Sequence, residues 1–375
     1  MYLILIFISG FVGLVYEVLW MKQLGLLFGN TSYAAGATLA AFFGGLAIGS
    51  WLWGRRAGRM KRPLRAYAWL EIGIAATAVL YFVILHVYSI AYPFLYQRIG
   101  SEWWLLAVKF ALTAGLVFPP TIFMGGTIPV IGQYLIRKRS NFGHAAALLY
   151  GVNTLGAALG AFVAGFYLPL WFGFSMTIIA AMVLNGLTAI GALLLSRRDE
   201  RRAQNSATAP EPKAQDRKRA KGKGKPSPPP ESGKRWAVFL VCFLSGFGFL
   251  ALEVLWTRMF AQVLENSVYT FAAILVIALC CLSTGAFVSS QLSRFQISPL
   301  HCLALLLLVS GLAVAATPFI FMQLTDSLQI LAMRGSWPSY ILMIFRKGFL
   351  AFGPSAFLLG TVFPENYQQH HAATQ

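Results

Sequence analysis

The chain has 375 residues, of which 58% are hydrophobic and 11% are charged, and its mean hydropathy is +0.66. Soluble domains usually carry about a quarter charged residues, so this composition excludes an ordinary soluble protein. The formal net charge of +18 does not indicate a nucleic-acid partner, because much of it lies in one linker and in short loops between apolar blocks. Those blocks are about 20 residues long or longer, which is enough to cross a bilayer. We therefore predict an all-α, polytopic membrane protein.

The apolar blocks predict ten transmembrane helices. In chain order they are 2–21, 33–54, 66–92, 104–131, 145–168, 174–195, 236–255, 268–290, 301–322 and 340–363. The loops after the second, fourth and sixth spans are rich in arginine and lysine, which is typical of the cytoplasmic side. We expect a multi-pass protein of the cell inner (plasma) membrane, with its N-terminus and linker in the cytoplasm. Anionic lipid is the expected neighbour of the basic loops.

A basic segment divides the chain. Residues 196–235 are rich in lysine, proline, serine and alanine and contain almost nothing apolar. Such a composition cannot bury enough surface to offset chain entropy, so we predict a disordered cytoplasmic linker. It separates a first membrane repeat of six helices (1–195) from a second of four helices (236–364), which is followed by a polar C-terminal tail (365–375).

The two membrane segments repeat each other. The stretch SGFVGLVYEVLW at 9–20 recurs as SGFGFLALEVLW at 245–256, an offset of 236 residues, and Gly49 matches Gly285 at the same offset. Six spans precede the second copy, so both copies should have the same orientation, as in transporters built from parallel repeats. The second copy has no counterpart of spans five and six. We therefore expect a major-facilitator-like arrangement of twelve spans that is truncated to ten spans.

Three acidic residues lie inside predicted spans. Glu17 and Glu253 occupy equivalent positions in the two copies, about 24 Å from the cytoplasmic end of each helix at 1.5 Å per residue. Glu71 lies one turn into the third span. A carboxylate in hydrocarbon is costly and should face protein or a wet cavity, so the three form a candidate intramembrane site for a cation or a proton. For Glu17 and Glu253 the alternatives are a buried structural ion pair or a position that reaches the outer headgroups with Trp20 and Lys22. For Glu71 the alternative is an interfacial residue that pairs with Arg62 and Arg65.

Basic residues enter the membrane from the same side as Glu17 and Glu253. Lys109 lies near the outer start of the fourth span, and Arg346 and Lys347 lie similarly in the tenth. An unpaired charge at that depth would be the more expensive arrangement. We therefore expect salt bridges from Glu17 to Lys109 and from Glu253 to Arg346 or Lys347.

Prolines recur at matching places in the two copies. They are Pro119, Pro120 and Pro129 in the fourth span and Pro354 and Pro364 in the tenth. Proline removes a backbone donor and kinks a helix, so we predict helix breaks at these positions. Broken helices at matching places are expected around a transporter site.

The fifth span carries a small-residue pattern. Gly156 and Gly160 have the spacing that suits close contact between membrane helices, and Asn153 is positioned to hydrogen-bond across that contact. We interpret these three residues as packing residues. No pattern in the chain predicts a metal ion, a cofactor or a catalytic group.

Several motifs in order indicate a family. The stretches SGFVGLVYEVLWMKQLGLLFGNTSYA, FFGGLAIGSWLWGRRAGR, PPTIFMGGTIPV and YGVNTLGAALGAFVAGF resemble the membrane domain of membrane-bound spermidine synthase-like proteins, in which a major-facilitator-like domain is fused to spermidine synthase. The resemblance implies a cytosolic aminopropyltransferase domain, but its glycine-rich loop and catalytic aspartates have no counterpart in this chain.

The resemblance leads to two hypotheses on function. The first is a transporter-like membrane module that exchanges polyamines or related cations with an aminopropyltransferase domain or partner at the cytoplasmic face. The second is a structural anchor or scaffold for that aminopropyltransferase, whose buried charges only pair with each other. In either case the residues present predict no enzymatic reaction.

Overall fold

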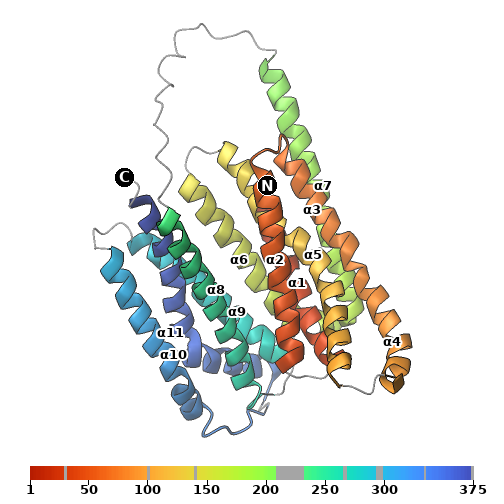
Figure 1. Ribbon diagram of the computed structural model, residues 1–375, viewed down its shortest axis with the longest axis vertical. Coiled ribbons are helices and arrows are strands. Elements are labelled where there is room, and N and C mark those ends of the chain that lie inside the picture. Colours follow the sequence, from red (N-terminus) through yellow and green to blue (C-terminus); the bar gives the residue numbers. More distant parts are fainter. Residues whose placement is uncertain are drawn as a thin grey trace.

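The computed structural model describes residues 1–28, 32–98, 102–138, 142–207, 232–264, 268–292, 299–332 and 335–372. Within these ranges the fold is all-α, as predicted, and its long helices run roughly side by side (Figure 1). In chain order the helices are α1 (Tyr2–Phe28), α2 (Ser32–Ala57), α3 (Pro63–Ala78), α4 (Leu80–Arg98), α5 (Glu102–Lys138), α6 (Phe142–Phe166), α7 (Leu168–Ala207), α8 (Ser232–Phe260), α9 (Val268–Leu292), α10 (Pro299–Leu324) and α11 (Trp337–Ala372).

The helices follow the predicted spans. Eight helical segments in the described part of the chain are long and apolar enough to cross a membrane. Helix α9 carries a shorter apolar stretch, Tyr269–Gly285, and α8 covers the span predicted at 236–255. The predicted third span contains two helices, α3 and α4. Together they form a single apolar segment, from Pro63 to Phe94, that is long enough to cross the membrane once.

The predicted helix breaks at proline are wrong. Helix α5 stays helical through Pro119, Pro120 and Pro129, and α11 stays helical through Pro354 and Pro364. A proline removes only its own donor, so the neighbouring turns keep their hydrogen bonds while packing against other helices holds the segment in place. For α5 the packing neighbours are mainly α2 and α3.

Helical geometry is interrupted elsewhere. Helix α3 ends at Ala78, and α4 begins at Leu80, after the single residue Val79. Inside α7, Gly173 has a φ of 73°, a conformation that glycine adopts without steric cost, and the helix bends there. Neither position contains one of the prolines from which breaks were predicted.

The ends of the predicted linker are helical. Helix α7 continues to Ala207 and α8 begins at Ser232, whereas we expected disorder throughout 196–235. The stretch SRRDERRAQ after the seventh helix's apolar part consists largely of good helix formers, so the helix continues beyond the apolar segment. Residues 208–231 of this segment lie outside the described residues.

Equivalent helices cross in the same way in the two copies. A Cβ added at Gly49 of α2 would lie 2.1 Å from the carbonyl oxygen of Ile122 in α5. A Cβ added at its counterpart Gly285 in α9 would lie 2.2 Å from the carbonyl oxygen of Phe357 in α11. Only glycine allows backbones to approach this closely, so the repeated glycine fixes the same helix pair in each copy.

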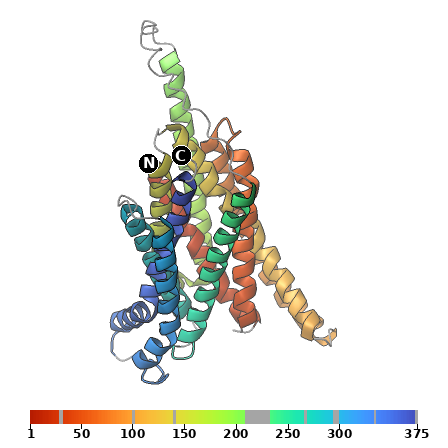
Figure 2. The same ribbon diagram turned by 60° about the vertical axis from the view of Figure 1, so that its left-hand side comes forward.

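The two copies meet mainly through α6 and α9. Aromatic rings fill this contact: Phe166 of α6 stacks on Tyr269 of α9 with centroids 5.8 Å apart, and Phe162 of α6 meets Phe345 of α11 at 5.8 Å. Figure 2 shows the second copy, in green to blue, against the first, with the N-terminus at the end from which α7 projects. This end carries the basic loops, and we call it the basic end.

Candidate functional site

Glu17 and Glu253 are buried at the boundary between the two copies. Each side chain is 2% exposed, and in each the Oε1 atom is buried without a hydrogen-bond partner. The Glu253 carboxyl lies close enough to Glu17 for the two groups to interact electrostatically. These equivalent residues, one on α1 and one on α8, are thus near enough to influence each other electrostatically, and we call them the acidic pair.

A buried tryptophan follows each of the two glutamates by one helical turn. Trp20, one turn after Glu17, is 1% exposed and stacks on Tyr16 at 5.0 Å between ring centroids. Trp256, one turn after Glu253, is 2% exposed and stacks on Phe352 of α11 at 4.6 Å. The repeated Glu-Val-Leu-Trp signature thus places a carboxyl and an indole together in the interior twice.

The predicted partner of Glu17 lies elsewhere. Within the described residues no ion pair joins Glu17 to Lys109; the Lys109 Nζ instead lies 6.0 Å from the centre of the Tyr92 ring in α4. The predicted salt bridge is wrong because matched depth in the membrane does not specify which side of a helix faces inward. Helix α5 packs mainly against α2 and α3 rather than α1.

The same correction applies to Glu253. Arg346 is exposed, and the Lys347 Nζ donates a hydrogen bond to the carbonyl oxygen of Leu324. That carbonyl is at the last residue of α10, where a helix has unsatisfied acceptors and favours a cation. Lys347 therefore caps α10 rather than neutralising Glu253.

Glu71 belongs to a separate buried network. Its side chain is 0% exposed, and its Oε2 accepts a hydrogen bond of 2.6 Å from the Asn185 amide, whose Oδ1 accepts one of 3.1 Å from the Tyr16 hydroxyl. The hydroxyls of Ser9 and Tyr67 lie beside the same carboxyl. The network joins α1, α3 and α7 inside the first copy, so Glu71 is not the interfacial residue of the alternative interpretation.

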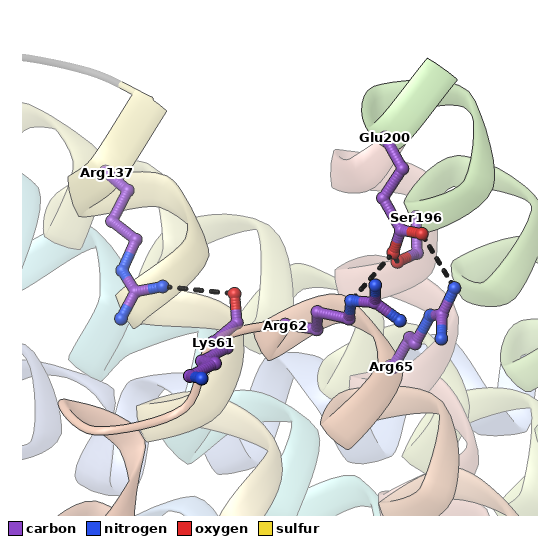
Figure 3. A network of polar contacts seen from close by, with 6 residues as sticks. All are labelled: Lys61, Arg62, Arg65, Arg137, Ser196 and Glu200. Atoms are coloured by element: carbon purple, nitrogen blue, oxygen red, sulfur yellow. Dashed lines mark hydrogen bonds and ion pairs between the residues drawn. The ribbon is translucent and has the colours of Figure 1, made fainter. Parts of the chain in front are cut away.

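Arg62 and Arg65 pair with a different acid. Figure 3 shows both guanidinium groups converging on Glu200 of α7, with nitrogen–oxygen distances of 3.5 Å from Arg62 and 2.7 Å from Arg65. The Ser196 hydroxyl donates to the same carboxylate at 3.2 Å. These contacts tie the start of α3 to the helical extension of α7 at the basic end.

A second contact holds the loop between α2 and α3. Arg137, near the end of α5, donates a hydrogen bond of 3.5 Å to the carbonyl oxygen of Lys61 (Figure 3). It donates another of 3.3 Å to the carbonyl oxygen of Gly58. Tyr134, one turn earlier, donates to Asp199 of α7 at 2.8 Å. Helices α5 and α7 are thereby joined to the loop and to each other.

The small residues of α6 lie against α1. A Cβ added at Gly156 or Gly160 would lie 2.1 Å from the carbonyl oxygens of Phe7 and Phe11, respectively. On the α1 side, a Cβ at Gly10 would lie 2.2 Å from the Asn153 carbonyl oxygen and 2.9 Å from its side-chain Oδ1. The residues predicted to pack thus lie in the tight α1–α6 contact.

Sequence reasoning missed the partners of Glu71. Asn185 is a polar amide inside the apolar stretch AAMVLNGLTAIG, a signal that was available. Its pairing with Glu71 joins residues 114 positions apart and could not be read from spacing. The role of Tyr16 in this network could not be predicted from the sequence either, although Tyr16 directly precedes Glu17.

Long apolar helices in two related copies define a multi-pass membrane protein. The family model of the Major Facilitator Superfamily matches residues 1–375, and the chain belongs to this superfamily. A comparison with curated proteins finds no match. The prediction of a major-facilitator-like, transporter-like membrane protein is therefore confirmed, whereas the narrower resemblance to spermidine synthase-like proteins stays a prediction.

Proposed function

We propose that this protein moves small organic cations of the polyamine type across the membrane, and that Glu17 and Glu253 bind them together. The observation that carries the proposal is the buried acidic pair, in which each carboxyl has an Oε1 atom without a hydrogen-bond partner among the described residues. Burying a carboxylate without a partner is costly, so such a group favours an incoming cation.

The pair suits a molecule with separated positive charges. One ammonium group can satisfy one carboxylate, so two acids from different helices match a chain with an amine at each end. Trp20 and Trp256 lie one turn from the acids. Indole rings attract ammonium groups and pack against methylene chains, so they suit the same ligand.

The position of the pair also supports transport. In transporters built from repeats, the substrate site lies where the repeats meet, and alternating access comes from motion of one repeat against the other. A ligand held by one acid from each repeat would respond to that motion. A purely structural pair of charges would instead need a base, and no ion pair of either glutamate occurs within the described residues.

The resemblance to spermidine synthase-like proteins suggests the source of the cargo. In this proposal the basic end faces the cytoplasm of a cell with the protein in its inner membrane, and polyamines are exchanged there with an aminopropyltransferase domain or partner. Arg62, Arg65 and Arg137 at that end would also hold anionic lipid.

Uptake into proteoliposomes tests the proposal. We expect saturable uptake of labelled spermidine that falls about tenfold or more in Glu17→Gln and in Glu253→Gln, because each loses a charge-assisted contact. Glu200→Gln, which changes an acid at the basic end, is the matched control and should retain uptake. Unchanged uptake in both glutamine variants would contradict the proposal and favour a structural anchor.

A further inference from the structure

The buried network around Glu71 has no counterpart in the second copy, although the acidic pair is repeated. The position equivalent to Glu71 is occupied by Leu307. The position equivalent to Tyr16, which belongs to the same network, is occupied by Leu252. Replacing buried charged groups by apolar side chains of similar volume is often neutral or stabilising. Packing alone therefore gives no reason for an acid at residue 71, and an acid inside a membrane helix indicates a function.

The Glu71 carboxyl is buried without a cationic partner. Its side chain is 0% exposed, and within the described residues no ion pair reaches it. Its Oε2 accepts a hydrogen bond from Asn185, whereas its Oε1 is buried and has no hydrogen-bond partner among the described residues. Removing an isolated charge from water is costly, and a carboxyl avoids this cost by binding a proton. The Oε1 atom is the free position for that proton.

The groups that face this carboxyl are hydroxyls and one amide. The hydroxyls of Ser9 and Tyr67 lie beside it, and Tyr67 also donates to the Leu5 carbonyl oxygen at 3.2 Å. Tyr16 of α1 and Tyr67 of α3 are the titratable groups near it. Helices α5 and α7 also pack on α3, and within the described residues neither places a titratable group beside Glu71. The carboxyl is therefore the one acid of this network.

Hydrogen bonds connect Glu71 to the neighbourhood of the acidic pair. Asn185 donates to Glu71 at 2.6 Å and accepts from Tyr16 at 3.1 Å. Tyr16 directly precedes Glu17 in α1, and its ring stacks on Trp20 with centroids 5.0 Å apart. Tyr16 thus contacts both the network of Glu71 and the indole that lies one turn from Glu17.

We propose that Glu71 is a proton-binding site coupled to the acidic pair through Asn185 and Tyr16. The coupling rests on the proposed function, because it requires a cation at Glu17 and Glu253. A positive charge favours the ionised form of a nearby carboxyl, so the bound cation should release the proton of Glu71. The Oε1–H bond breaks, its electron pair stays on the carboxylate and the proton passes to water. Coupling between two binding sites is reciprocal, so a proton on Glu71 should weaken cation binding.

Infrared difference spectroscopy of the full chain in phosphatidylcholine vesicles tests the proton site without a ligand. A protonated carboxyl has a carbonyl-stretch band that an ionised or metal-bound carboxylate lacks. We expect a pH step to change this band, and we expect one component of the change to be lost in Glu71→Gln. Glutamine has the same shape and keeps an oxygen that can accept from Asn185, so the variant should remain folded. Glu200→Gln, which changes a partly exposed acid at the basic end, is the matched control and should keep the component. A spectrum that Glu71→Gln leaves unchanged would overturn the proposal.

Addition of spermidine at constant pH tests the coupling. Saturating spermidine should remove the Glu71 component of the band and release protons to an indicator dye, and Glu71→Gln should release fewer protons per bound spermidine. Tyr16→Phe keeps the ring beside Trp20 and loses only the hydroxyl, so it should bind spermidine while the Glu71 component changes less. A Glu71 component that stays unchanged while spermidine binds would overturn the coupling. A chain that shows this component but binds no spermidine would contradict the proposed function, and with it the coupling, while supporting the proton site.

Discussion

Asn185 determines how the first copy is held together at the level of single residues. Its amide donates to Glu71 at 2.6 Å and its carbonyl oxygen accepts from Tyr16 at 3.1 Å, so one side chain links α1, α3 and α7. All three residues are buried. Each polar atom in such an interior has few alternative partners, and removing one member leaves the others unsatisfied.

Replacing Asn185 should therefore destabilise the fold. In Asn185→Leu, the Glu71 carboxyl and the Tyr16 hydroxyl both lose their hydrogen bond to the Asn185 side chain, and we expect a loss of about 1–3 kcal/mol in the free energy of unfolding. Thr188→Val is the control on the same helix, because among the described residues the Thr188 hydroxyl bonds only to the α7 carbonyl of Leu184. Unfolding in mixed micelles measures both, and equal losses in the two variants would contradict the assigned role.

The glycines of α6 allow a second test at this scale. A side chain at Gly156 would collide with the Phe7 carbonyl, so Gly156→Leu should force α6 away from α1 and cost about 1–3 kcal/mol or more. Gly151→Leu, on the same helix with nothing within 4 Å of its added Cβ, should be close to neutral. Thermal unfolding monitored by size-exclusion chromatography compares the two. A Gly156 variant as stable as the Gly151 variant would show that the contact is loose.

At the scale of elements, side-chain ion pairs connect the start of α3 to the extension of α7. Glu200 receives Arg62 and Arg65, but its side chain is 31% exposed and those of the arginines are 55% and 37% exposed. Water and salt screen such pairs, so they position the loop between α2 and α3 more than they stabilise the fold.

Glu200→Gln should accordingly have a small and salt-dependent effect. We expect a loss of about 1 kcal/mol or less at low ionic strength. The difference from the unchanged protein should shrink in about 1 M salt, where the Debye length is about 3 Å. Denaturation at the two salt concentrations measures this, and a large difference that salt leaves unchanged would indicate a buried ionic network instead.

The elements themselves were largely predictable. Blocks of apolar residues gave the positions of the helices because only a helix satisfies its own backbone in lipid. The effect of proline was not predictable, since α5 stays helical through Pro119, Pro120 and Pro129 while the actual bend in α7 lies at Gly173. The packing around a residue decides whether a helix tolerates it, and that packing involves helices distant in sequence.

At the scale of the whole molecule, the two copies meet through α6 and α9 and bring one glutamate from each copy together. The repeat identified Glu17 and Glu253 as a related pair from sequence. It could not reveal that they lie near each other rather than near Lys109, Arg346 or Lys347. Depth in a membrane follows from residue counting, whereas the side of a helix that faces inward depends on its neighbours.

The proposed shared binding also predicts how the two acids combine. If one ligand contacts both carboxyls, the effects of the two glutamine substitutions should not add, because the residues act on the same bound molecule. The double variant should then lose less binding free energy than the sum of the two single losses. Two independent sites would give additive losses.

Equilibrium binding of labelled spermidine to the purified protein tests the central claim most directly. We predict saturable binding to the unchanged chain, with Glu17→Gln and Glu253→Gln each weakening the affinity about tenfold or more and the double variant showing the non-additive loss. An affinity that is the same in the unchanged chain and in the double variant would contradict the claim that these two glutamates form a cation site.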